Sequence, residues 1–229
     1  MQALEILNRE IIACRKCPRL VEYLAEVARV KRRAYRDCDY WAKPVPGFGD
    51  PRARLLLIGL APGAHGANRT GRPFTGDSSG VFLYKVMYDT GFASQPTALS
   101  RDDGLKLHDA YIGASLRCAP PDNKPLLEEI RNCRPYLERE LALLKNVRVV
   151  IALGKLAFDN YLAILRDHGN IARRSDFVFA HNRSHRTGPE QPILISSYHP
   201  SQQNTSTGKL TEAMFRAVFL RAKRLIAGT

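Results

Sequence analysis

The sequence predicts an α/β fold with a mostly parallel, four-stranded sheet and helices on both faces. Short apolar runs bounded by turn or charge signals indicate four buried strands, at residues 54–59, 110–116, 147–154 and 192–200. Helical patterns between these runs indicate helices at residues 78–91, 126–145 and 154–167. Strands that alternate with helices in this way are typical of parallel sheets covered on two sides.

Further helices are expected at both ends of the chain. Near the N-terminus one helical face carries Leu4, Leu7 and Ile11, and a second helix is expected from Pro18 to about Ala34. A final helix from about Lys209 to Ile226 has an apolar stripe along one side. In the helix at residues 126–145 we expect a break near Pro135.

Size and composition favour one compact domain. The 229 residues are 45% hydrophobic and 25% charged, enough to bury a sizeable core, so we expect a single domain over residues 1–229. No apolar run approaches the roughly 20 residues that cross a bilayer, and the first residues do not form an apolar signal core. We therefore expect a cytoplasmic protein, without membrane contact, that acts as a monomer.

The charge balance indicates a polyanionic partner. Lys and Arg number 35 against 22 Asp and Glu, which gives a net charge of +13. An excess of this size favours binding to nucleic acid, although a solvated basic surface is the alternative.

Five cysteines point to a metal site better than to disulfides, because the number is odd and no secretory signal precedes them. Cys14 and Cys17 form a CRKC motif, and Cys118 and Cys133 lie far downstream. Zinc and an iron-sulfur cluster both accept four thiolates, and residue type alone does not separate them. Ordinary buried cysteines are the remaining alternative, and Cys38 is interpreted as structural.

Two polar loops follow predicted strands, where α/β sheets carry their functional groups. The first, GLAPGAHGANRTGRPFTGDSSG at residues 59–80, does not match a GxGxxG loop and has no P-loop lysine. A plain glycine-rich connector would not explain Phe74 and Asp77 within it. The second, SYHPSQQNTSTG at residues 197–208, contains His199, which would ordinarily be a core or surface histidine.

Four elements carry a resemblance to a known family: the two loops, the segment CAPPDNKP at residues 118–125, and the four cysteines. In their residues and their order they resemble the iron-sulfur uracil-DNA glycosylases, specifically family 5, the B-type enzymes. The resemblance implies a three-layer α/β/α fold. It also implies hydrolysis of the N-glycosidic bond of uracil, and of hypoxanthine and xanthine, in DNA by base flipping, which leaves an abasic site. A [4Fe-4S] cluster would be held by Cys14, Cys17, Cys118 and Cys133, with residues 1–50 supplying part of its site.

The resemblance also assigns roles to single residues. Phe74 would stack on the flipped base, and His199 would donate a hydrogen bond to the base oxygen. Asp77 would orient water or stabilise the sugar cation, although an N-cap for the following helix explains the same residue equally well. Further substrate contacts are expected from Gly59, Ala61, Gly63, Asn123, Ser201 and Asn204. For Asn123 a turn-forming role is the alternative.

Two departures from related branches refine the subclass. Other branches place an acidic or amide side chain where this chain has Leu60 to Pro62, and family 4 enzymes have an Asn where this chain has Ala114. A broader range of bases is therefore expected, and no lysine resembles that of a lyase. Two other classes stay open: a four-cysteine metal-containing nucleic-acid-binding module without catalytic activity, and a nucleotide-binding transferase on a similar sheet.

Overall fold

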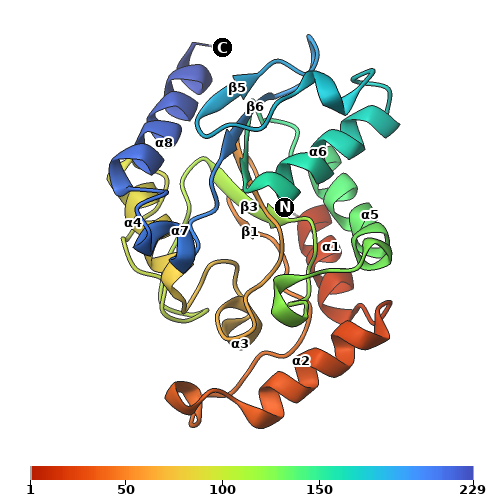
Figure 1. Cartoon of the computed structure of the whole chain (residues 1–229), viewed down its shortest axis with the longest axis vertical. Coiled ribbons are helices and arrows are strands. Elements are labelled where there is room, and N and C mark those ends of the chain that lie inside the picture. Colours follow the sequence, from red (N-terminus) through yellow and green to blue (C-terminus); the bar gives the residue numbers. More distant parts are fainter. Residues whose placement is uncertain (1, 229) are drawn as a thin grey trace.

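A six-stranded mixed sheet forms the centre of the computed structural model, which describes residues 2–228 (Figure 1). The strands, in chain order, are β1 (Phe48–Gly49), β2 (Leu55–Gly59), β3 (Ala110–Ala114), β4 (Val149–Leu153), β5 (Arg183–His185) and β6 (Ile193–Ser197). In space they run β1-β3-β2-β4-β6-β5, and the four inner strands are parallel. The four predicted strands are thus confirmed as the parallel centre of the sheet.

The two edge strands, β1 and β5, pair antiparallel with their neighbours and were not predicted. They contain only two and three residues, too few to show an alternating pattern in the sequence. Short strands at the two edges leave little unpaired backbone on which another chain could add a strand.

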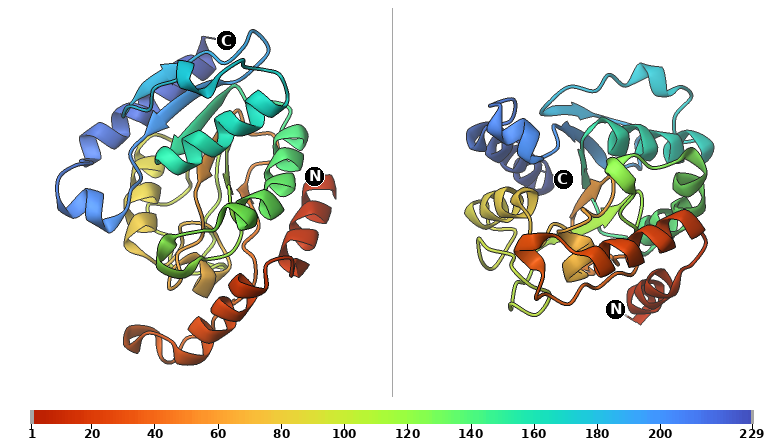
Figure 2. Two further views of the ribbon diagram at one scale, coloured as in Figure 1. Left: turned by 45° about the vertical axis from the view of Figure 1, so that its right-hand side comes forward. Right: turned by 60° about the horizontal axis from the view of Figure 1, so that its bottom comes forward.

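Helices cover both faces of the sheet, which confirms the three-layer arrangement (Figures 1 and 2). One face carries α1 (Gln2–Ala13), α5 (Leu127–Leu143) and α6 (Lys155–Asp167), and the other carries α4 (Ser78–Asp89) and α8 (Glu212–Ala227). The remaining long helix, α2 (Pro18–Val30), follows α1 and projects beyond the body of the sheet (Figure 2).

The inner strands are apolar on both sides because each side packs against a helical layer. Along β2, Leu56 and Ile58 contact the core under α5 and α6, whereas Leu55 and Leu57 contact the core under α4 and α8. All five residues of β2 and of β4 are buried. Among the described residues no helix is long and apolar enough to span a membrane.

The expected break at Pro135 is wrong, because the 17-residue helix α5 runs through this position without interruption. Packing of Cys133, Tyr136 and Leu137 against the core holds the helix on both sides of the proline and outweighs the lost backbone hydrogen bond. The expected extension of α2 to Ala34 is also wrong. Lys31 has a φ of 52°, which ends the helix there.

Candidate active site

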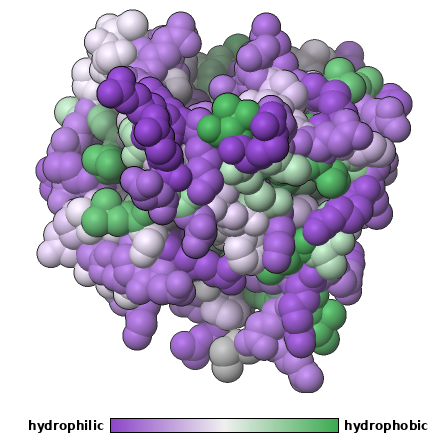
Figure 3. Space-filling view, turned by 90° about the horizontal axis from the view of Figure 1, so that it is seen from below, coloured by the Kyte–Doolittle hydropathy of each residue, from purple (hydrophilic) through white to green (hydrophobic). Residues whose placement is uncertain are grey.

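A cavity of about 280 Å³ opens where β2, β3 and β6 end, and residues of both polar loops line it. Short helices lie within these loops: α3 (Ala67–Thr70) in the lower half of Figure 1 and α7 (Gln202–Ser206) at about mid-height, beside α4. Of the site residues expected from the sequence, the cavity is lined by Gly59, Ala61, Gly63, Phe74, Asp77, Asn123, His199 and Ser201. Of the expected catalytic and substrate-binding residues, Asn204 alone does not line it. Seen from below, hydrophilic side chains cover most of the protein, with hydrophobic ones scattered between them (Figure 3).

Phe74 occupies a strained position in the cavity wall. Its φ is 51°, in the left-handed region that non-glycine residues seldom adopt, at a cost on the order of 1–3 kcal/mol. Two glycines make the position possible. A Cβ on Gly59 would lie 3.2 Å from the phenyl ring, and a Cβ on Gly80 would overlap the carbonyl oxygen of Phe74.

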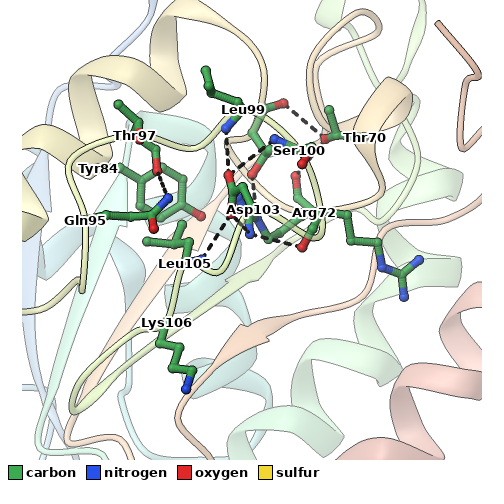
Figure 4. Close-up of polar contacts among 12 residues, drawn as sticks. Thr70, Arg72, Tyr84, Gln95, Thr97, Leu99, Ser100, Asp103, Leu105 and Lys106 are labelled. Carbon is green, nitrogen blue, oxygen red and sulfur yellow. Dashed lines mark hydrogen bonds and ion pairs between the residues drawn. The ribbon is translucent and has the colours of Figure 1, made fainter.

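A buried ion pair holds the backbone before Phe74 (Figure 4). Arg72 donates two hydrogen bonds to the carboxylate of Asp103, at 2.8 and 2.7 Å, and Asp103 also accepts from the backbone amides of Leu99 and Leu105. Burial opposes ionisation of Asp103, but the hydrogen bonds outweigh it and hold its pKa at about 2. The Tyr84 hydroxyl donates to the carbonyl oxygen of Pro73 at 2.8 Å. The strained loop is therefore rigidly anchored.

His199 faces Phe74 across the cavity. The two ring centroids lie 5.9 Å apart with an angle of 32° between the ring planes. Neither ring nitrogen of His199 hydrogen-bonds to another of residues 2–228, whereas its backbone carbonyl accepts from the Asn204 amide at 2.9 Å. Burial lowers the pKa of His199 to about 4, so the imidazole is neutral near pH 7 and keeps one N–H to donate.

Asp77 caps α4 and also faces the glycine-rich loop. Its Oδ1 accepts a hydrogen bond from the Gly80 amide at 2.9 Å, so the N-cap interpretation holds. Its Oδ2 lies close to Gly63 and Gly66, where a Cβ on Gly66 would overlap it. Burial raises the pKa of Asp77 above its ordinary value. One oxygen is thus engaged by the helix, while the other is directed into the loop that lines the cavity.

The cavity rim is formed by two turns. Asn123 is exposed and has a φ of 57°, directly after Asp122 at 53°, so it serves the tight turn while it lines the cavity. Ser201 caps α7, because its Oγ accepts a hydrogen bond from the backbone N–H of Asn204 at 3.3 Å. The side-chain amide of Asn204, in α7, donates to the backbone carbonyl of His199. Asn204 therefore positions the backbone of His199 without lining the cavity.

Sequence reasoning missed a second buried ion pair, Arg117 with Glu140, beside the cavity floor. Arg117 lines the cavity and donates to Glu140 Oε2 at 2.6 Å, and both side chains are almost completely buried. Gly113 lies against Glu140, where a Cβ would overlap the carboxylate. The partners are 23 residues apart, so no local pattern links them, and only the position of Arg117 next to Cys118 draws attention to it.

The four cysteines named above line one small hollow on the far side of the segment that follows β3. The Arg117 amide donates to Cys133 Sγ at 3.2 Å, and the Asn132 amide group donates to Cys17 Sγ at 3.7 Å. Burial raises the pKa of Cys133 to about 11 and raises that of Cys118 further. Cys38 lies outside this hollow. Among residues 2–228 no three His, Cys, Asp or Glu side chains converge closely enough to hold a single metal ion.

Known proteins resemble almost the entire chain. The model of a family described as the uracil DNA glycosylase superfamily matches residues 46–223. A type-5 uracil-DNA glycosylase of Thermus thermophilus is 52% identical over 96% of this chain and 97% of its own length. One of Mycobacterium leprae is 46% identical over 96% and 94%. A type-4 enzyme of Sulfurisphaera tokodaii is 26% identical over 95% and 84%.

Proposed function

The chain belongs to the uracil-DNA glycosylase superfamily, and we propose that it hydrolyses the N-glycosidic bond of uracil and of other deaminated bases in DNA. One observation carries the proposal. The phenyl ring of Phe74 and the unpartnered imidazole of His199 share one cavity at the strand ends. An aromatic face and a free donor are the two groups that a flipped base requires.

The cavity suits a base that has left the duplex. A base inside a duplex is out of reach, so the enzyme extrudes it at a cost of a few kcal/mol, which is smallest for a mispaired base. Stacking on Phe74 returns roughly 1–3 kcal/mol. The net charge of +13 favours approach to the phosphates on either side.

The chemistry follows from where charge develops. When the bond between the sugar C1′ and the base nitrogen breaks, the electron pair leaves with the base and the sugar becomes cationic. The neutral His199 donates a hydrogen bond to the base oxygen as its negative charge grows, a type of contact worth about 10²–10³ in rate. Water then adds to C1′ while the Oδ2 of Asp77 orients it or stabilises the cation. The water loses a proton as the C1′–O bond forms, and the departed base takes up one proton, which completes the hydrolysis. Among the described residues no lysine lines the cavity, so we expect the abasic site to be released intact.

A small side chain at Ala114 supports a broad range of bases. Ala114 lines the cavity where family 4 enzymes carry an Asn, so no amide at this point selects uracil. We therefore include hypoxanthine and xanthine among the substrates.

A [4Fe-4S] cluster held by Cys14, Cys17, Cys118 and Cys133 is part of the proposal. Four thiols line one hollow, and amide groups already donate to two of the sulfurs, as is common around such clusters. The cluster would be structural, since it would tie the N-terminal helices to the sheet. A brown protein containing iron supports this assignment, and a colourless, zinc-containing protein contradicts it.

The activity is tested with oligonucleotides that carry one uracil, hypoxanthine or xanthine. After incubation, half of each sample is treated with alkali, which breaks the strand at abasic sites. We expect breaks only in the treated half. No breaks would indicate a binding module without catalysis, and breaks without alkali would indicate a lyase.

We also propose that the enzyme is a monomer in the cytoplasm. Five cysteines without a disulfide between them suit a reducing compartment. Size-exclusion chromatography with light scattering tests the monomer, and an elution mass of a dimer would contradict it.

A further inference from the structure

A basic turn, residues 31–36, follows α2 and does not line the base cavity. Its backbone forms a single 3₁₀ turn, Arg33–Tyr35. The side chains of Arg32, Arg33 and Arg36 are exposed, and within the described part of the chain none of the three forms an ion pair. Three guanidinium groups therefore face solvent at this turn.

The helix before the turn does not explain this charge. Cations near a helix C-terminus interact favourably with the helix dipole, but the effect fades beyond the last turn. Arg33 and Arg36 stand three and six residues beyond the end of α2. Asp37 and Asp39 follow them, yet neither forms an ion pair among residues 2–228, and residues 31–39 keep a net charge of +2.

The basic turn is fixed to the glycine-rich loop of the base cavity. The Trp41 amide donates to the backbone carbonyl of Arg69, in α3, at 2.9 Å. The Tyr40 hydroxyl and Nδ1 of His65 share a hydrogen bond at 2.9 Å. The guanidinium of Arg69 lies over the ring of Tyr35, 4.0 Å from its centroid. The turn therefore has a defined place beside α3, at the lower end of the molecule in Figure 1.

The same short helix borders the base cavity. Ala67, the first residue of α3, lines the cavity, whereas Arg69 contacts the basic turn. Arg32 also acts on this loop, because burial and then the charges of Arg32 and Arg69 lower the pKa of His65. A helix is about 10–12 Å wide, and a DNA strand advances about 3.4 Å per nucleotide. A strand with one base in the cavity would pass the turn within about three or four nucleotides.

We propose that the basic turn binds the DNA backbone beside the flipped nucleotide, with Arg32, Arg33 and Arg36 directed to phosphate oxygens. The inference rests on the proposed function, which makes DNA the partner, and adds the path of the backbone on one side of the cavity. A guanidinium group matches a phosphate through two parallel N–H donors. Binding here holds the strand on the side of the glycine-rich loop while the base enters the cavity.

The salt dependence of DNA binding tests the proposal. The probe is a duplex with one 2′-fluoro-2′-deoxyuridine, in which the fluorine disfavours the sugar cation and keeps the base attached. Fluorescence anisotropy gives the Kd at several salt concentrations. In the triple variant Arg32→Gln, Arg33→Gln, Arg36→Gln we expect the Kd near 0.1 M salt to rise at least about tenfold. The slope of log Kd against log salt should fall by about two to three, because each phosphate contact contributes about 0.9.

A matched control removes three positive charges at the opposite end of the parallel strands. Arg52, Lys145 and Arg148 are exposed and precede β2 and β4, whereas the cavity lies where the strands end. Their triple change to Gln should leave the slope unchanged, and thermal melting confirms that both triple variants are folded. An equal loss of slope in the two variants, or a wild-type slope in the turn variant, overturns the proposal.

Neutral phosphates locate the contact. Methylphosphonate replaces one phosphate at a time on each side of the fluorinated nucleotide. We expect several-fold weaker binding to the wild type at positions within about four nucleotides on one side, and no such effect in the turn variant. The same sensitivity in both proteins overturns the proposal.

Uracil release by the wild type is measured separately with a uracil duplex. Release without a change of slope in the turn variant overturns this inference alone, whereas absence of release overturns the proposed function.

Discussion

The base cavity and the cysteine hollow lie on opposite sides of the segment 114–118, and they are built in opposite ways. In the cavity the imidazole of His199 forms no hydrogen bond through its ring nitrogens with another of residues 2–228. In the cysteine hollow, backbone and side-chain amides already donate to the sulfurs. The difference indicates that substitutions in the cavity reduce rate with little loss of stability, whereas substitutions around the cysteine hollow reduce stability.

Two buried ion pairs support the cavity from behind. Arg72 with Asp103 anchors the strained loop, and Arg117 with Glu140 lies between the cavity and the cysteines. These pairs belong to the scaffold, so their loss should appear in stability first.

The largest effect is expected from Glu140→Ala, which leaves Arg117 buried without its counter-charge. Breaking a buried pair in this way costs about 3–5 kcal/mol, or a fall in Tm of roughly 6–20 °C. The control is Glu138→Ala on the same helix, whose partly exposed pair with Arg134 is worth about 0–1 kcal/mol. Calorimetric melting measures both, and equal Tm values would show that Arg117 is satisfied by other groups.

Phe74→Ala is expected to lower kcat/KM for uracil release by roughly 5- to 150-fold, because a stacking contact of about 1–3 kcal/mol is lost. Phe74→Tyr keeps the aromatic face and should retain most of the rate. Single-turnover release from a uracil oligonucleotide measures both variants. If the Ala variant were as fast as the Tyr variant, Phe74 would not contribute a stacking contact with the base.

The pH dependence tests Asp77. Burial raises its pKa above the ordinary 3.8, and the ionised form is the active one, so the rate falls as pH drops through that raised value. The neutral form of His199 persists down to about pH 4, so the rate should be level around neutral pH. In Asp77→Asn the overall rate is lower, and the part of the acid decline that comes from protonation of Asp77 disappears. An acid limb identical in both proteins would assign it to another group.

The smallest effect on uracil itself is expected from Ala114→Asn. An amide added to the cavity wall should preserve uracil release while lowering hypoxanthine release, which changes the ratio of the two by roughly tenfold. Ala114→Ser adds a polar group without the amide and serves as the control. The ratio is measured with paired oligonucleotides that carry uracil or hypoxanthine. An unchanged ratio would show that residue 114 does not determine the substrate range.

The sequence predicts the parts of this molecule whose signals are local. Apolar runs such as residues 55–59 mark buried strands, and glycines with Phe74 mark the loop at the strand end. The pairing of Arg117 with Glu140 has no local signal, because its partners meet only when α5 packs on β3. The helix break predicted at Pro135 is absent because tertiary packing outweighs the preference of proline to end a helix.

The central claim is that the free imidazole of His199 accelerates release of the base. The most direct test measures free uracil released in a single turnover by wild type and by His199→Ala, together with the Tm of each. We predict a rate lower by about 10²–10³, with a Tm close to that of the wild type because the ring nitrogens form no hydrogen bond with another of residues 2–228 that the substitution would remove. An unchanged rate would contradict the claim, as would a loss of rate accompanied by unfolding of the variant.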